Sequence, residues 1–130
     1  MSTIKKRDIL FIKDENSEFD TNSSKFGELF NRADIALDKH KALKLIYAND
    51  YDMLIHDITV DYTDGFTFVK QIQQMKPTTA IFAFVAPKDE PLLGELMELN
   101  VDAYLLNPED LTPALEHLSE MVLHPITPKS

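Results

Sequence analysis

The sequence contains no cysteine, only three glycines and no long apolar run, and each of these shortages excludes a class of protein. Without cysteine the chain cannot form disulfides, use a thiolate nucleophile, or bind zinc or an iron–sulfur cluster through thiolates. With 44% hydrophobic and 27% charged residues, its composition is that of a globular domain and not of a disordered or collagen-like chain. The longest apolar stretch, residues 80–86, is far shorter than a membrane-spanning helix.

Basic residues are also scarce, since 13 Lys and Arg stand against 22 Asp and Glu, which gives a net charge of -9 at pH 7. This charge repels nucleic acids and anionic membranes, so we expect neither to bind unless the charge is sharply segregated. A length of 130 residues fits one domain, which we assign to residues 1–123, with 124–130 as a flexible tail. The first seven residues show no signal-peptide core, so we expect a cytoplasmic protein.

Short apolar segments alternate with segments of helical periodicity. Residues 8–12, 53–55, 80–86 and 103–106 are apolar and end in polar or turn-prone residues, and residues 33–37 form a weaker fifth segment. Their nearly continuous hydrophobicity is typical of parallel strands that are covered on both faces. Because a helical segment follows each of them, the pattern predicts a doubly wound α/β domain with right-handed crossovers.

The helical segments are recognised by apolar residues spaced three or four positions apart. The apolar sides of the first two are expected to comprise Phe19, Phe26, Leu29 and Phe30, and Ala42, Leu43, Ile46 and Tyr47. Asn16 or Ser17 is the expected N-cap of the first helix, and Asp89 that of the fourth, with Pro91 in its first turn.

Functional residues in open α/β sheets gather at the carboxyl ends of the strands, and Asp14 and Asp57 are the carboxylates that follow buried strands there. Four segments carry a resemblance to a known family: ILFIKDE at 9–15, YDMLIHDITVDYTDGF at 51–66, IFAFVAPKDE at 81–90 and VDAYLLNP at 101–108. In this order and at these separations, they resemble the receiver domains of two-component response regulators, of the single-domain chemotaxis type. The resemblance covers nearly the whole chain.

The resemblance implies a flavodoxin-like fold, with five helices around a five-stranded parallel sheet of strand order 2-1-3-4-5. It implies that Asp57 is the phosphoacceptor, which takes a phosphoryl group from a histidine kinase. Asp14 matches the acid that binds Mg²⁺ together with Asp57, and the main-chain carbonyl of Thr59 matches the third protein ligand. Such hard oxygen ligands suit Mg²⁺, which offsets the charge repulsion between phosphate and carboxylate.

Three signature positions depart from the family pattern. Lys13 replaces the first acid of an acidic pair, Val85 replaces a hydroxyl residue, and Asn107 replaces a lysine. Val85 cannot bind a phosphoryl oxygen, and Asn107 can donate only a neutral hydrogen bond, which is weaker than a charge-assisted one. Lys13 either faces the solvent, pairs with the carboxylates or substitutes for the missing lysine. In each case we expect Mg²⁺ binding to be weak or lost.

Three further residues have roles that the resemblance or the strand pattern suggests. Tyr104 matches the family's switch aromatic, and the Asn107–Pro108 peptide matches a step that is usually cis, so we predict a cis bond before Pro108. His56 should point away from Asp57 across the sheet and be structural, because successive strand residues alternate. The outer faces of the fourth helix, fifth strand and fifth helix are a possible homodimer surface.

These features leave two functional hypotheses in competition. In the first, the chain is an atypical receiver that signals through contact with a histidine kinase or another signalling protein, with a weakened or absent switch at Asp57. In the second, it is a working phosphorelay receiver, in which Asp57 accepts phosphate with Mg²⁺. A third reading, a phosphatase of the haloacid dehalogenase kind, is disfavoured because Thr59 stands where a second acid is expected and the chain is short. We therefore expect no enzymatic activity.

Overall fold

Five parallel strands form the central layer of the structure, a computed structural model that describes residues 6–13, 18–58 and 65–123. The strands are β1 (Asp8–Ile12), β2 (Arg32–Ala36), β3 (Met53–Asp57), β4 (Ala80–Val85) and β5 (Asp102–Leu105). Their order is β2-β1-β3-β4-β5, which confirms the predicted sheet. The expected tail, residues 124–130, lies outside the described residues.

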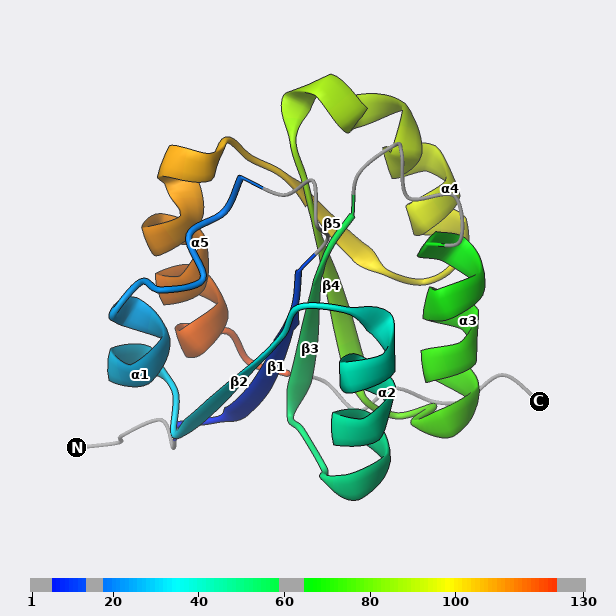
Figure 1. The fold of residues 1–130 in the computed structure, drawn as a ribbon. Coiled ribbons are helices and arrows are strands. Elements are labelled where there is room, and N and C mark those ends of the chain that lie inside the picture. Colours follow the sequence, from blue (N-terminus) through cyan, green and yellow to red (C-terminus); the bar gives the residue numbers. More distant parts are fainter. Residues whose placement is uncertain (1–5, 14–17, 59–64, 124–130) are drawn as a thin grey trace.

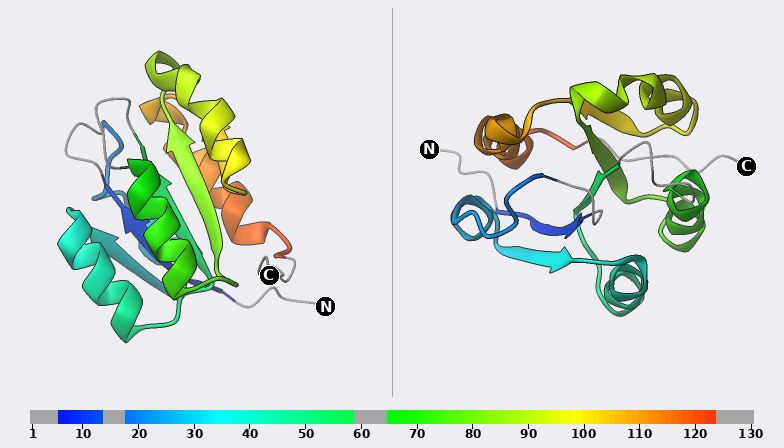
Figure 2. Two further views of the ribbon diagram at one scale, coloured as in Figure 1. Left: turned by 90° about the vertical axis from the view of Figure 1, so that its right-hand side faces the viewer. Right: turned by 45° about the horizontal axis from the view of Figure 1, so that its top comes forward.

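Helices cover both faces of this sheet, as the alternating pattern predicts (Figures 1 and 2). They are α1 (Lys25–Leu29), α2 (Lys39–Ala48), α3 (Gly65–Met75), α4 (Leu93–Glu98) and α5 (Leu111–Glu120), with the 3-10 helices η1 (Pro87–Leu92) and η2 (Pro108–Asp110). Helices α1 and α5 lie on one face, and α2, α3 and α4 lie on the other. The fold is therefore the predicted doubly wound α/β arrangement with five helices.

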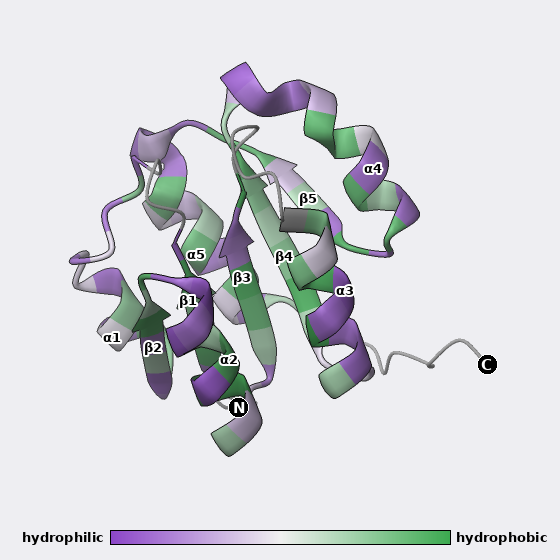
Figure 3. Cartoon of the chain, turned by 45° about the vertical axis from the view of Figure 1, so that its right-hand side comes forward, coloured by the Kyte–Doolittle hydropathy of each residue, from purple (hydrophilic) through white to green (hydrophobic). Residues whose placement is uncertain are grey.

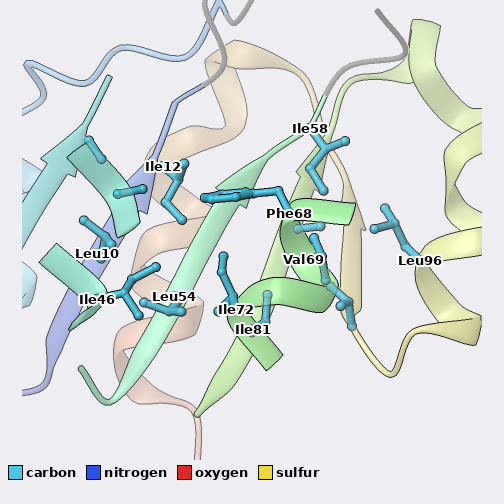
Figure 4. Packing of buried hydrophobic residues seen from close by; sticks show 14 of the residues in the cluster. Leu10, Ile12, Ile46, Leu54, Ile58, Phe68, Val69, Ile72, Ile81 and Leu96 are labelled. Carbon is cyan, nitrogen blue, oxygen red and sulfur yellow. The ribbon is translucent and has the colours of Figure 1, made fainter. Parts of the chain in front are cut away.

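Each strand contributes to two separate cores because its side chains alternate between the faces. Leu10 and Ile12 of β1 pack toward α2 and α3, whereas Ile9 and Phe11 pack toward α1 and α5. Figure 4 shows part of the first core, and Figure 3 shows the hydrophobic strands between helices whose outer sides are hydrophilic. Burial on both faces explains why the strands read as continuous apolar segments.

The first helix is much shorter than its apolar spacing predicts. It begins only at Lys25, and of the expected buried phenylalanines only Phe26 lies within it, although Phe19 and Phe30 are buried as well. The Asp20 carboxylate accepts a hydrogen bond from the Asn22 amide at 2.9 Å. Such local side-chain bonds compete with helix formation, so the segment before α1 forms turns. The expected N-cap positions, residues 16 and 17, lie outside the described residues.

The fourth helical segment also departs from expectation, because Asp89 does not cap an α-helix. It lies inside η1 with φ -106° and ψ 16°, which breaks the helical path, and α4 begins four residues later at Leu93. Pro91 offers no N–H and limits the backbone before it, so a continuous α-helix from Asp89 is disfavoured.

Helix α2 buries a narrower stripe than its sequence suggests. Ala42 and Ile46 are fully buried, whereas Tyr47, predicted for the same side, is 83% exposed. Because each residue turns the helix by about 100°, Tyr47 lies well outside the stripe defined by Ile46. The side of α2 that faces away from the sheet therefore carries an exposed aromatic ring.

Candidate functional site

Asp57 is the last residue of β3, the central strand of the sheet. Its neighbours Met53 and Ile55 belong to the core on the α1 and α5 side, so alternation places Asp57 on that side too. Only 2% of the residue is exposed. The tip of β3 is a hydrophilic end on a hydrophobic strand (Figure 3). A buried carboxylate at the carboxyl edge of the central strand is the most distinctive polar group of the fold.

Lys13 follows β1 directly and is half-buried. The register pairs Ile12 of β1 with His56 of β3, so one residue further on Lys13 comes beside Asp57. The Lys13 amide donates a hydrogen bond to the Ala36 carbonyl at 2.9 Å, which ties the end of β1 to β2. Adjacent strands lie about 5 Å apart, so the two oppositely charged residues share one edge of the sheet.

Val85 ends β4, the strand on the other side of β3. It comes one residue after Phe84, which pairs with Asp57 in the register. Val85 is fully buried in the same apolar cluster as Ile58 and Leu96. Its surroundings are therefore those of an aliphatic side chain, and it brings no hydrogen-bonding group to this edge of the sheet.

Asn107 follows β5 and is exposed where the chain enters η2. The backbone N–H of Asn107 donates a hydrogen bond to the Asp110 carboxylate at 3.3 Å, and the backbone N–H of Asp110 donates one to the backbone carbonyl of Asn107 at 2.9 Å. The predicted cis bond before Pro108 is wrong, because no peptide bond among the described residues is cis. Extended backbone at Asn107 already suits a trans proline, which occupies the first turn of η2.

Tyr104 is half-buried on β5, at the side of the sheet that carries Asp57. Its ring lies 6.3 Å from that of Phe84, edge to face, and 6.1 Å from the imidazole of His117 on α5. Burial raises the pKa of its hydroxyl, and the nearby Asp102 adds to this effect. The ring is therefore packed between a strand and a helix, one strand removed from β3.

His56 faces the opposite side of the sheet from Asp57 and is 1% exposed, as its structural interpretation requires. Its ring contacts that of Phe68 on α3 edge to face at 5.4 Å. Burial lowers its pKa to about 3, and the positive charge of Lys39 contributes in the same direction. The imidazole is therefore neutral near neutral pH and is part of the core.

A second buried acid was missed by sequence reasoning. Asp89 is 0% exposed, and its amide donates to the Ala86 carbonyl at 2.8 Å, just after β4. In the sequence it stands between Lys88 and Glu90 in a polar stretch, which gives no signal of burial. Only the path of η1 over the sheet edge places this carboxylate inside.

The remaining predicted site residues, Asp14 and Thr59, lie outside the described residues. Among the described residues no group of three or more His, Cys, Asp or Glu is arranged to hold a metal ion. The structure thus places Lys13, Asp57 and Val85 on neighbouring strand ends, with Lys13 and Asp57 toward one face of the sheet and Val85 in the core of the other face.

The strand order and the acid at the tip of the central strand define a doubly wound α/β domain of the flavodoxin-like type. Comparison with protein families then shows to which family this domain belongs. The model of the response regulator receiver domain matches residues 9–119. The chain belongs to this family. No described helix has the length and apolar character needed to cross a membrane.

Solved structures agree in fold. A CheY-like response regulator receiver domain protein from Methanospirillum hungatei JF-1 is 16% identical with a TM-score of 0.66, covering 91% of this chain and 95% of that one. The receiver domain of Francisella response regulator 1452 is 22% identical with a TM-score of 0.65, over 88% and 97%. A CheY-like receiver domain from Methylobacillus flagellatus is 25% identical with a TM-score of 0.64, over 88% and 99%.

Membership in this family makes the chain a receiver domain of two-component signal transduction. Receiver domains are generally signalling domains without enzymatic activity, and they interact with kinases or other signalling proteins. They typically bind Mg²⁺ at the site of phosphorylation.

Proposed function

We propose that this receiver domain signals by protein contact and that phosphorylation of Asp57 switches it weakly or not at all. The proposed phosphoacceptor is Asp57, whose carboxylate would form a bond to phosphorus as the bond to the kinase histidine breaks. The alternative is full phosphorelay function at the same residue. The two hypotheses differ in whether phosphorylated Asp57 is stabilised once it has formed, and in whether its formation changes the rest of the domain.

The observation that supports weak switching most directly is the burial of Val85. A hydroxyl at the end of β4 would donate a hydrogen bond to a phosphoryl oxygen on the adjacent strand. Val85 has no such donor, and its buried apolar side chain would gain no favourable interaction by moving toward a charged group. Tyr104, packed against Phe84 and His117, would then keep its position.

The other altered residues affect charge at the same edge. Asn107 supplies no positive charge for the phosphoryl group, and its backbone is engaged with Asp110 in η2. Lys13 comes beside Asp57 in register and carries the positive charge that Asn107 lacks. A lysine ammonium here partly offsets the charge of an adduct and at the same time opposes a divalent cation.

We propose that Mg²⁺ is a weakly bound cofactor, held by Asp14, Asp57 and the main-chain carbonyl of Thr59. The donor set is made of hard oxygen atoms, which suits this ion. The ion would neutralise charge between the incoming phosphate and the carboxylate. Lys13 replaces a potential third acid, so we expect weaker binding than in a site with three carboxylates.

We further propose a cytoplasmic location and a histidine kinase or another signalling protein as partner. The apolar side chains Met97 and Leu105, which are 71% and 45% exposed, provide contact area on α4 and β5. Exposed side chains of this size commonly mark contact surfaces when they occur together.

The proposal is tested by phosphorylation with acetyl phosphate and Mg²⁺, followed by intact-mass measurement over time. We expect Asp57 to be labelled slowly and Asp57→Asn not to be labelled, whereas Asp102→Asn, which removes an exposed acid, should react like the wild type. Val85→Thr combined with Asn107→Lys should lengthen the lifetime of the adduct about tenfold, because two donors to the phosphoryl group are restored.

Amide spectra recorded with Mg²⁺ and beryllofluoride distinguish the two hypotheses. Shifts confined to the neighbourhood of Asp57 support the weak switch. Shifts that extend to Tyr104 in the wild-type protein would favour the full phosphorelay instead. Persistent labelling of the Asp57→Asn variant would place the phosphoacceptor elsewhere and overturn the proposal.

A further inference from the structure

The charge of this chain is sharply segregated along the sequence. Residues 89–120 contain nine Asp and Glu residues and no Lys or Arg. The rest of the chain holds thirteen acidic and thirteen basic residues, so the whole net charge of -9 resides in this one segment. In the fold, the segment forms most of η1 and all of α4, β5, η2 and α5, at the β5 edge of the sheet.

The outer surface of α4 and β5 combines this charge with exposed apolar groups. We call Glu95, Met97, Glu98 and Leu105 the acidic face; all four are exposed. Helix α4 packs against β5, so these residues come from neighbouring elements. The face thus presents apolar contact area among negative charges.

The opposite edge of the molecule carries a surface of opposite charge. Helix α2 has three lysines and one histidine and no acidic residue. We call Leu37, His40, Lys41, Lys44 and Tyr47 the basic face; all five are exposed, Leu37 by 55% and Tyr47 by 83%. Within α2, the positions of His40, Lys41, Lys44 and Tyr47 place them along one side of the helix, and Leu37 lies just before the N-cap.

Acids near the basic face are already engaged. Asp34 forms an ion pair with Arg32 at 2.8 Å, and Asp50 forms one with Lys76 at 2.8 Å. The Asp38 carboxylate accepts the Lys41 amide at 2.8 Å as the helix N-cap. Neither Lys41 nor Lys44 forms an ion pair with any residue that the structure describes. The positive charge of this surface is therefore available to a partner.

We propose that the basic face of one chain docks on the acidic face of a second copy, head to tail. Both faces pair charged groups with two exposed apolar side chains, and their charges are complementary. The two faces of one molecule cannot meet, because α3 lies between α2 and α4 (Figure 2, left). A symmetric dimer through α4, β5 and α5 would instead set like charges against each other, since a twofold interface repeats the same patch.

Head-to-tail contacts leave one unused face at each end, so the assembly grows with concentration unless it closes into a ring. Attraction between exposed charges is screened by salt, with a Debye length of about 10 Å at 0.1 M. We therefore expect an average mass that rises with protein concentration at low salt and approaches that of one chain, 14.9 kDa, at high salt.

The test is sedimentation equilibrium of the purified chain at low salt, with variants of each face. Lys41→Glu with Lys44→Glu should weaken association at least tenfold, and Glu95→Lys with Glu98→Lys should do the same. Mixing these two variants should restore association, because the intact acidic face of the first docks on the intact basic face of the second, and the two reversed faces are again opposite in charge. Lys25→Glu with Lys70→Glu has the same net charge as the first variant and should associate like the wild type.

Circular dichroism and thermal unfolding establish that each variant is folded before it is compared. A wild-type chain that stays monomeric at every concentration and low salt would overturn the proposal, and would leave the basic face to a different acidic protein. A dimer that persists when Lys41 and Lys44 are reversed would point to a symmetric contact and would also overturn it.

Discussion

At the residue scale, the end of β3 shows how one position along a strand changes the role of a side chain. His56 and Asp57 are neighbours in sequence and both are nearly fully buried, yet they face different sides of the sheet. His56 packs against Phe68 within an apolar core, whereas Asp57 stands at the edge beside Lys13. Alternation of strand side chains therefore separates a structural histidine from the proposed phosphoacceptor.

The burial of His56 makes stability depend on pH. Its pKa is lowered to about 3 in the folded chain, so between about pH 3 and 6.5 the unfolded chain binds more protons than the folded one. The free energy of unfolding must therefore fall as the pH falls through this range. In His56→Leu this contribution is absent. We expect the stability of the wild type, relative to this variant, to drop by about 2 kcal/mol between pH 8 and about pH 5.

Urea unfolding of both proteins at a series of pH values measures this difference. Other acidic and basic groups are common to the two proteins, so they cancel in the comparison. Any constant offset near pH 8 reports the change in packing against Phe68 and not titration. Parallel stability curves across the range would mean that His56 accepts a proton in the folded chain.

At the element scale, local side-chain bonds decide where helices begin. Asp38 is an N-cap in extended conformation, and α2 starts directly after it. Before α1, Asp20 bonds to the Asn22 amide and Ser23 to the Lys25 amide, and the helix is delayed until Lys25. The same residue types thus begin one helix and postpone another, according to the amide that each side chain reaches.

The cap of α2 gives a prediction for stability. Asp38→Ala removes the acceptor of the Lys41 amide and should lower the free energy of unfolding by about 1 kcal/mol. Asp38→Asn retains a capping oxygen and should cost clearly less. Chemical denaturation of both variants beside the wild type provides the measurement. An equal loss in the two variants would assign the effect to the charge of Asp38 and not to its hydrogen bond.

At the scale of the whole molecule, the concentration of negative charge at the β5 edge opposes the compact state. Eight of the nine acids between residues 89 and 120 are exposed, and Asp89 alone is buried. Ion pairs on other elements, such as Lys25 with Glu28 at 3.0 Å, are exposed and contribute little. Repulsion among like charges is therefore the larger exposed electrostatic effect.

Added salt should therefore stabilise the chain. At protein concentrations below those of self-association, raising NaCl from about 10 mM to about 0.3 M should increase the free energy of unfolding by about 1 kcal/mol. Glu98→Gln with Glu116→Gln should reduce the dependence of the free energy of unfolding on salt. Glu18→Gln with Glu28→Gln, outside the acidic segment, should leave a larger salt dependence than the first pair does. Urea is the suitable denaturant because it is uncharged. A fall in stability with salt would show that attractive pairs dominate.

The parallel sheet was predictable because strands buried on both faces leave a plain signal, whereas its strand order came from the family resemblance. The acid after the third strand marked the candidate site. Helix bounds were predicted less well. Apolar spacing did not reveal that Phe19 is buried from a turn, or that Pro91 and the backbone at Asp89 divide the fourth helical segment. The cis bond expected before Pro108 came from family resemblance alone and is absent.

The order of elements, the parallel sheet and the acid at the end of β3 follow from the sequence by itself, because periodicity and strand ends are local properties of the chain. Only the tertiary structure decided that Asp89 is buried, that Val85 sits in an aliphatic cluster beside the strand of Asp57, and that Tyr47 faces outward among lysines. These facts depend on which elements pack together across long separations in sequence, and local patterns do not record that.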